Sequence, residues 1–297
     1  MFTKQRKAAL LQLGQAGLYL APSLVLFVVF IFYPLVKSAH LSLFTVDLMG
    51  RERVYLGFQR YVDMFSSRQF LHSLWVTLLF SLYTVVPGMV IALFLAYMAN
   101  WQLRGVALFR TVFAFPLSIA VAGASMIFMM MFNSSAGVFA YFLQVLHLPA
   151  VSWLVDPNWA LVSVSLVAIW RGIGFNTIVL LSGLQSIPQQ LYESAKMDGA
   201  ISWRQFVDIT LPLLSPALFF VFIVSVINSL QTFGEINILT QGGPSEATNV
   251  IVYSIYREGF FNLNYGYASA EAIVLFVIIL ALTLFEFWLL ERKVFYQ

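Results

Sequence analysis

QSIPQQLYESAKMDGAISWRQFVDITLPLLSP, residues 185–216, is the stretch of this chain that decides its fold. Pro188 is suited to the first position of a helix, and Gly199 is suited to a helix C-terminus. Ser202 and Gln205 have the spacing of a capping box, which would open a second helix. The stretch therefore predicts two short helices joined by a tight turn.

The second of these helices is amphipathic and leads into a long apolar run. Trp203, Phe206, Val207 and Thr210 share one helical face. The two prolines within 212–216 are predicted to break the helix and re-aim the chain. Such a hairpin is suited to passing motion from a soluble partner into a membrane. The residues alone equally favour a hairpin that packs only against its own bundle.

The composition of the chain is that of a membrane protein. Of its 297 residues, 61 % are hydrophobic and only 10 % are charged, whereas soluble domains carry about a quarter charged residues. The absence of cysteine excludes disulfides, Cys-ligated metals and thiol catalysis. The three histidines are scattered without metal-ligand spacing, so no metal site is predicted. A net charge of +3 is too small to indicate nucleic-acid binding.

Spanning a bilayer takes about 20 mostly apolar residues in a helix, and six segments are long enough. The fold class predicted is therefore an all-α integral membrane protein. The first segment is too long for a signal peptide and is expected to be a retained anchor. The predicted spans are Gly17–Val36, Phe70–Met98, Leu108–Phe132, Ala160–Leu184, Leu213–Phe233 and Ala268–Leu290.

Lysine and arginine mark the predicted cytoplasmic side of a membrane protein. They occur in the N-terminal tail, in the connections 100–107 and 185–210, and in the C-terminal tail. This pattern predicts that both termini are cytoplasmic and that the hairpin between the fourth and fifth spans is cytoplasmic too. The first external loop, 38–68, breaks the trend because it holds four arginines.

The hairpin sequence has a specific resemblance to a known family. The run Glu193–Ala200, followed by Phe206 and Leu211-Pro212, resembles the "EAA" coupling loop of binding-protein-dependent ABC importer permeases, with Ser194 in place of the usual first alanine. The similarity runs from about Tyr19 to Tyr296. Its further motifs are those of the carbohydrate-uptake subfamily, whose members import sugars, polyols and glycerol 3-phosphate. They are Phe115-Pro116, Trp170-Arg171-Gly172, Leu184–Pro188, Thr240–Pro244 and Gly266–Ala270.

The resemblance implies an assembly in the inner membrane of a bacterium. A second homologous permease, the other of two unlike subunits, would complete the pore. Two ABC ATPase subunits would bind ATP and Mg²⁺ beneath it, and an extracytoplasmic solute-binding protein would deliver the solute. The chain itself has no G-x-x-x-x-G-K-[ST] phosphate loop, so it is expected to need no cofactor and to be no enzyme. Residues 1–297 would form one transporter domain, with its core at 70–290 and 17–36 as a peripheral span.

In such relatives the glutamate and glycine of the loop sit in a cleft of the ATPase. The resemblance therefore assigns Glu193 and Gly199 to the ATPase contact, with Asp198 bracing the turn and an apolar face filling the socket. The full expected coupling set is Glu193, Ala195, Asp198, Gly199, Ala200, Trp203 and Phe206.

Polar side chains in mid-span point to the solute pathway. An arginine at the centre of a span costs about 2.5–3.5 kcal/mol on insertion scales, so Arg171 must face the bundle interior, water or a partner, and Glu235 is a possible internal one. Ser225, Ser229 and Thr232 recur at helical spacing. Side chains of this kind can also serve only to bond neighbouring helices.

The maltose-type relative holds its sugar on the third, fourth and fifth spans. Phe175 is expected to stack on a sugar ring or polyol chain, and Arg171 to fork onto hydroxyls or a phosphate. Apolar residues on the third and fourth spans argue against maltose itself. When the sugar site of that relative is transferred through the matched motifs, the resemblance implies a solute site in this chain. Its residues are Leu117, Val121, Ala168, Arg171, Gly172, Phe175, Ser225, Asn228, Ser229 and Thr232.

Two other functions fit the sequence less well. A secondary carrier usually shows internal repeats and broken helices around an ion site, and neither a repeat nor a mid-span acid pair is visible. A membrane enzyme would need a convergent nucleophile, acid–base or metal set, and the sequence offers none.

Overall fold

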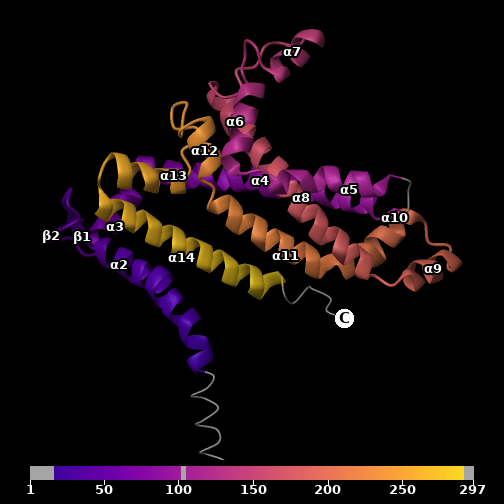
Figure 1. The fold of residues 1–297 in the computed structure, drawn as a ribbon, viewed down its shortest axis with the longest axis horizontal. Helices are drawn as coiled ribbons and strands as arrows, with labels where there is room; N and C mark the ends of the chain where they lie inside the picture. The colour runs from indigo at the N-terminus through magenta and orange to yellow at the C-terminus, as the bar shows by residue number, and fades with distance from the viewer. Residues whose placement is uncertain (1–16, 102–104, 291–297) are drawn as a thin grey trace, which may run out of the picture. The chain divides into compact units, whose positions relative to one another are not determined.

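The computed structural model describes residues 17–101 and 105–290 and is predominantly helical (Figure 1). The basic residues expected at both tails and at Arg104 lie outside this part of the chain. The helices and strands after Phe32 are α2 (Tyr33–Leu41), β1 (Phe44–Val46), β2 (Glu52–Tyr55), α3 (Gln59–Ser66), α4 (Arg68–Ala99), α5 (Val106–Ala114), η2 (Phe115–Ser118), α6 (Val121–Met131), α7 (Val138–Val145), α8 (Pro157–Ser186), α9 (Gln189–Met197), α10 (Ser202–Gln205), η3 (Phe206–Thr210), α11 (Leu211–Leu230), α12 (Gly234–Leu239), α13 (Ile251–Tyr256), η4 (Arg257–Phe261) and α14 (Tyr265–Leu290).

Within the described residues, five helices are long and apolar enough to cross a membrane, and a bent pair of helices makes a sixth candidate. The all-α membrane fold predicted from the sequence is therefore confirmed. The five are Gly17–Leu41, Arg68–Ala99, Pro157–Ser186, Ser202–Leu230 and Tyr265–Trp288.

The third predicted span, Leu108–Phe132, is not the continuous helix that was expected. Its two halves, Arg110–Ser118 and Val121–Met131, meet at an angle of 107°. Pro116 lies in the 3₁₀ turn that ends the first half, and Ala120, just before the second half, is extended. Proline provides no backbone N–H for the preceding turn, so the helix ends here and a new one begins.

Internal contacts divide the chain into two compact units. Among the described residues, the first unit contains 17–64 together with Arg257–Val274, and the second contains 65–101, 105–256 and 275–290.

The second unit is built on α4, α8 and α11, which pack against one another. Small residues allow the close approach, as is common between membrane helices. A Cβ added to Gly183 of α8 would lie 2.8 Å from the side chains of Leu214 and Ala217 on α11. A Cβ added to Gly174 would lie 2.5 Å from the carbonyl oxygen of Phe113 on α5. These contacts fix the separation of the helices that surround the site described below.

The helix–turn–helix predicted at residues 185–216 is present as α9 and α10, at the C-terminal end of α8 (Figure 1). Gly199 lies between them with φ +78°, a left-handed conformation that favours glycine. The predicted capping box is wrong, because Ile201 is the N-cap and Ser202 makes no cap bond. The Gln205 side chain instead donates to the carbonyl oxygen of Ala200 at 2.8 Å and so closes the turn.

The predicted break at Pro212 and Pro216 is also wrong. One helix runs without interruption from Ser202 to Leu230. The residues just before Pro212 form the π-helical turn η3, Phe206–Thr210. A π turn is wider than an α turn and marks a local adjustment of the backbone hydrogen bonds, which explains how the helix accommodates a proline there.

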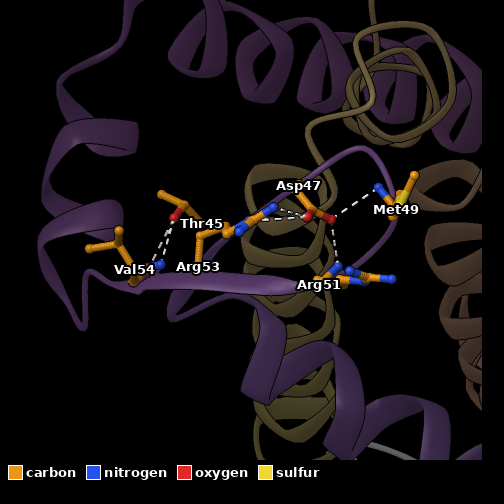
Figure 2. Close-up of polar contacts among 6 residues, drawn as sticks. All are labelled: Thr45, Asp47, Met49, Arg51, Arg53 and Val54. Carbon is orange, nitrogen blue, oxygen red and sulfur yellow. Dashed lines mark hydrogen bonds and ion pairs between the residues drawn. The ribbon is translucent and has the colours of Figure 1, made fainter.

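The first unit gives structural partners to two of the four arginines in the loop that broke the charge pattern. Figure 2 shows the turn of the β1–β2 hairpin closed around Asp47, whose carboxylate accepts from the backbone N–H of Arg51 at 2.8 Å and of Met49 at 3.0 Å. The Arg53 guanidinium donates to the same carboxylate. These bonds, led by the one from Arg51, lower the pKa of Asp47 below its usual value. Arg60 is buried and donates to the carbonyl oxygen of Phe44 at 2.7 Å. Arg53 and Arg60 therefore have structural partners within their own unit.

We expect Gly174→Ala to destabilise the protein by about 1–3 kcal/mol, because the new methyl group overpacks the contact with the backbone of α5. Gly172→Ala is the matched control on the same helix, since its Cβ meets no atom within 4 Å. Thermal unfolding of the purified transporter measures both. Equal melting temperatures for the two variants would contradict the packing described here.

Candidate functional site

The second unit contains a cavity of about 420 Å³, which lies within the usual size range of small-molecule sites. It is lined from α4, η2, α6, α8, α11 and the start of α12. All ten residues that the sequence assigned to the solute line this one cavity. They are Leu117, Val121, Ala168, Arg171, Gly172, Phe175, Ser225, Asn228, Ser229 and Thr232.

The cavity also has residues that the predicted set omitted. Thr84 and Gly88 come from α4, a helix that was not expected to contribute. The signal for Thr84 is the recurrence of Ser73, Thr77, Ser81 and Thr84 at helical spacing in an otherwise apolar run. The other additional lining residues are Ile169, Asn176, Gln231, Phe233, Gly234 and Glu235.

Two interruptions of helical structure meet at this cavity. The first is the bend between η2 and α6, which contributes Leu117 and Val121. The second lies between α11 and α12, at 231–233. The two are packed tightly, since a Cβ on Gly234 would lie 2.5 Å from Cγ1 of Val121. Non-helical backbone at membrane depth is tolerated only where it is buried in protein or lines a water-filled cavity. Both breaks meet this condition, because they pack against each other and line the cavity.

Arg171 and Glu235 form an ion pair in the cavity wall. Nη1 of Arg171 donates to Oε1 of Glu235, as the sequence had suggested. The Glu235 side chain is only 6 % exposed, whereas that of Arg171 is 31 % exposed. The arginine thus compensates a carboxylate that would be very unfavourable if buried alone, and it still presents part of its guanidinium to the cavity.

The remaining polar side chains fall into two groups. Some bond to the protein: Ser229 donates to Ser81 at 2.9 Å, and Thr232 donates to the carbonyl oxygen of Asn228 at 3.2 Å. Within residues 17–101 and 105–290, the side chains of Asn228 and Gln231 make no hydrogen bond. The buried hydroxyl of Thr84 likewise has no partner there. This second group leaves hydrogen-bonding capacity available to a ligand.

The cavity also offers an aromatic surface. Phe175 lies on α8 and is 37 % exposed. Its ring is tilted against that of Phe220, with the centroids 6.4 Å apart. A partly exposed ring in the same cavity as unpaired amides suits a molecule with both an apolar face and hydroxyl groups.

The predicted coupling residues are gathered on the α9–α10 hairpin. Glu193, Asp198, Gly199 and Trp203 are exposed, whereas Ala195, Ala200 and Phe206 are half-buried. The tip is notably apolar for an exposed turn, because Met197 is 89 % exposed and Ile201 is 69 % exposed. The sequence reasoning missed both, although Met197 stands directly before Asp198.

The hairpin is held to its own bundle at its base. The Tyr192 hydroxyl lies 3.0 Å from the Thr210 hydroxyl, which joins α9 to η3. The Phe206 ring meets Tyr97 of α4 edge-on, with centroids 5.5 Å apart. Phe206 therefore packs within the bundle, whereas Trp203 presents an exposed ring. The base of the hairpin is therefore held by contacts within the bundle, whereas its tip is exposed.

Comparison with known proteins gives a consistent result. Residues 64–294 match the family model described as "Binding-protein-dependent transport system inner membrane component". The chain is 38 % identical over 281 residues to the sn-glycerol-3-phosphate transport system permease protein UgpA of Brucella suis biovar 1 (strain 1330), covering 94 % of this chain and 95 % of the relative. It is 37 % identical over 282 residues to the protein of the same name from Agrobacterium fabrum (strain C58 / ATCC 33970), with the same coverage.

Solved structures resemble the chain over nearly its whole length. A chain of a bacterial ABC transporter involved in the import of the acidic polysaccharide alginate gives a TM-score of 0.82 at 27 % identity, covering 98 % of each chain. A chain of the alginate transporter in complex with alginate pentasaccharide-bound periplasmic protein gives 0.81 at 26 % identity, covering 96 % of this chain and 95 % of that one. The membrane helices, the hairpin and these matches agree: this chain belongs to the family of binding-protein-dependent transport system inner membrane components.

Proposed function

We propose that this permease subunit passes a hydroxylated solute (a sugar, a polyol or a glycerol-3-phosphate-like molecule) through the cavity on α8 and α11. The observation that carries the proposal is the meeting of all ten expected solute residues around one cavity with unpaired polar side chains. The permeases most similar in sequence are named for sn-glycerol 3-phosphate, and the similar structures for alginate. Both compounds are rich in hydroxyl groups.

The energy for transport is proposed to come from ATP hydrolysed in separate subunits. Two ABC ATPases would hold ATP and Mg²⁺, and each would receive one coupling hairpin. The exposed apolar tip of the α9–α10 hairpin supports such a contact, since exposed apolar patches mark interaction sites. Glu193 and Gly199 are proposed to enter the ATPase cleft.

A continuous helix connects this hairpin to the cavity. The helix Ser202–Leu230 carries Trp203 near one end and Asn228 near the other. At about 1.5 Å per residue it spans roughly 40 Å. Movement of the hairpin by an ATPase would therefore tilt the helix that carries Ser225 and Asn228, and this supports alternating access as the mechanism.

The proposed assembly is completed by two further proteins. A second homologous permease would form the other half of the pore, and an extracytoplasmic binding protein would deliver the solute. Both termini of this chain would be cytoplasmic, on the same side as the hairpin, in a bacterial inner membrane. The chain would act as one transporter domain.

The coupling role is tested by replacing Gly199 with proline. Gly199 has φ +78° and donates its N–H to Lys196 at 3.0 Å, and proline can do neither. We expect Gly199→Pro to abolish co-purification of the ATPase with the permease, and Glu193→Ala to weaken it.

Gly50→Pro is the matched control for this substitution. Gly50 has φ +77° and donates to Asp47 at 2.9 Å, but it lies in the β1–β2 hairpin. We expect the Gly50→Pro variant to retain the ATPase. Undiminished ATPase recovery with Gly199→Pro would count against the coupling role.

The solute site is tested with two asparagines that line the cavity. We expect Asn228→Ala to lower uptake about two- to tenfold, the equivalent of one lost hydrogen bond of about 0.5–1.5 kcal/mol. Its melting temperature should not change, because the side chain bonds to no described residue. Asn176→Ala is expected to lower the melting temperature, because Asn176 donates to Ser225 at 3.3 Å.

Uptake is measured with the ligand that the external binding protein is found to bind by calorimetry. Wild-type uptake by the Asn228→Ala variant would remove this residue from the solute site.

A further inference from the structure

The charge of the cavity wall is balanced within the wall itself. Among the described residues that line the cavity, only Arg171 and Glu235 carry a charge, and they are paired with each other. The other lining side chains are neutral amides, hydroxyls, aliphatic groups and two phenylalanines. The described residues of this chain therefore contribute no net charge to the cavity wall.

The pair is not free to separate. The Glu235 side chain is 6 % exposed and has its bond to Arg171. If the guanidinium turned to serve an anion in the cavity, the carboxylate would be left buried without a counter-charge, which is strongly unfavourable. The start of α12, which carries Glu235, is also fixed by the close packing of Gly234 on Val121. The carboxylate therefore has little freedom to withdraw.

We propose that Glu235 is a specificity-determining residue that makes this cavity select an uncharged, polyhydroxylated solute over an anionic one. The inference rests on the proposed function of the cavity and narrows its solute class. A phosphate monoester carries a charge of about −1.5 to −2 at neutral pH. It would approach a fixed carboxylate while competing with that carboxylate for the one arginine.

An uncharged solute uses the same wall without this conflict. A guanidinium has five N–H donors, and the exposed part of Arg171 can donate to a hydroxyl or ring oxygen while Glu235 remains paired. Asn228 and Gln231 supply both donors and acceptors, and Thr84 supplies a hydroxyl. Phe175 supplies the apolar face for a carbon ring or chain.

The solute proposed for this chain is uncharged, whereas the compounds for which its relatives are named are charged. Those names are sn-glycerol 3-phosphate and an acidic polysaccharide. Selection between charged and uncharged solutes would depend here on the carboxylate of Glu235 rather than on the number of arginines in the cavity.

The test compares sn-glycerol 3-phosphate with glycerol as probes that differ only in the phosphate. Binding of each to the purified, complete transporter in lipid nanodiscs is measured by titration calorimetry at low ionic strength. We expect the wild type to bind sn-glycerol 3-phosphate no more tightly than glycerol. Glu235→Gln removes the carboxylate charge and should tighten binding of sn-glycerol 3-phosphate at least tenfold.

Two controls separate this charge effect from a structural one. Glu235→Asp keeps the carboxylate and should retain the wild-type preference. Combining Arg171→Gln with Glu235→Gln removes both charges and should abolish the gain. If Glu235→Gln and the wild type bind sn-glycerol 3-phosphate equally, the proposal is overturned.

The wild type alone also tests the proposal, whether or not the variants fold. Binding of sn-glycerol 3-phosphate at least tenfold tighter than that of glycerol would overturn the inference, and the proposed function would still stand. Failure of the proposed function has a different signature, namely a complete transporter that shows no ATP-dependent uptake of any sugar, polyol or glycerol phosphate.

Discussion

The hydrocarbon of the bilayer is the constraint on which the rest of this structure depends. Every backbone N–H and C=O at membrane depth must be bonded within the protein, which long helices achieve by themselves. An interruption is tolerable only against other protein or a wet cavity. The two interruptions that line the cavity, after η2 and after α11, interlock through Val121 and Gly234. The constraint thus both builds the helices and concentrates the non-helical backbone at one place.

The same constraint explains how two distant parts of the molecule are connected. The helix Ser202–Leu230 begins in the hairpin and ends at the cavity without a break. Its π-helical turn, η3, adjusts the backbone before Pro212 while the helix remains continuous. At its base the hairpin is tied to the bundle by Tyr192 and Phe206. A rigid element with a braced base and an exposed tip is suited to carrying force, and the matches to importer permeases agree with that design.

Much of this was readable from the sequence, for physical reasons that differ between features. Apolar runs of bilayer length are recognisable as spans from composition alone. Arg171 and Glu235, which are 64 positions apart, could be paired because each needs compensation in an apolar span. The bend at Pro116 was not read, since a proline in an apolar run fits a kinked helix as well as a break. Thr84 was missed although Ser73, Thr77, Ser81 and Thr84 recur at helical spacing on α4 and so indicate a polar face. The capping box failed because the Gln205 side chain bonds across the turn to Ala200, a local alternative that residue spacing cannot show.

The most direct test of the account is whether water and solute reach the cavity within the membrane. The chain contains no cysteine, so Asn228→Cys gives a single thiol in the cavity, and Leu82→Cys gives one on the exposed face of α4 away from it. In the complete transporter, a membrane-impermeant thiol reagent should label Asn228→Cys at a rate that changes with ATP and falls with solute, and should leave Leu82→Cys unmodified. Labelling of Asn228→Cys no faster than that of Leu82→Cys in every nucleotide state would contradict the account.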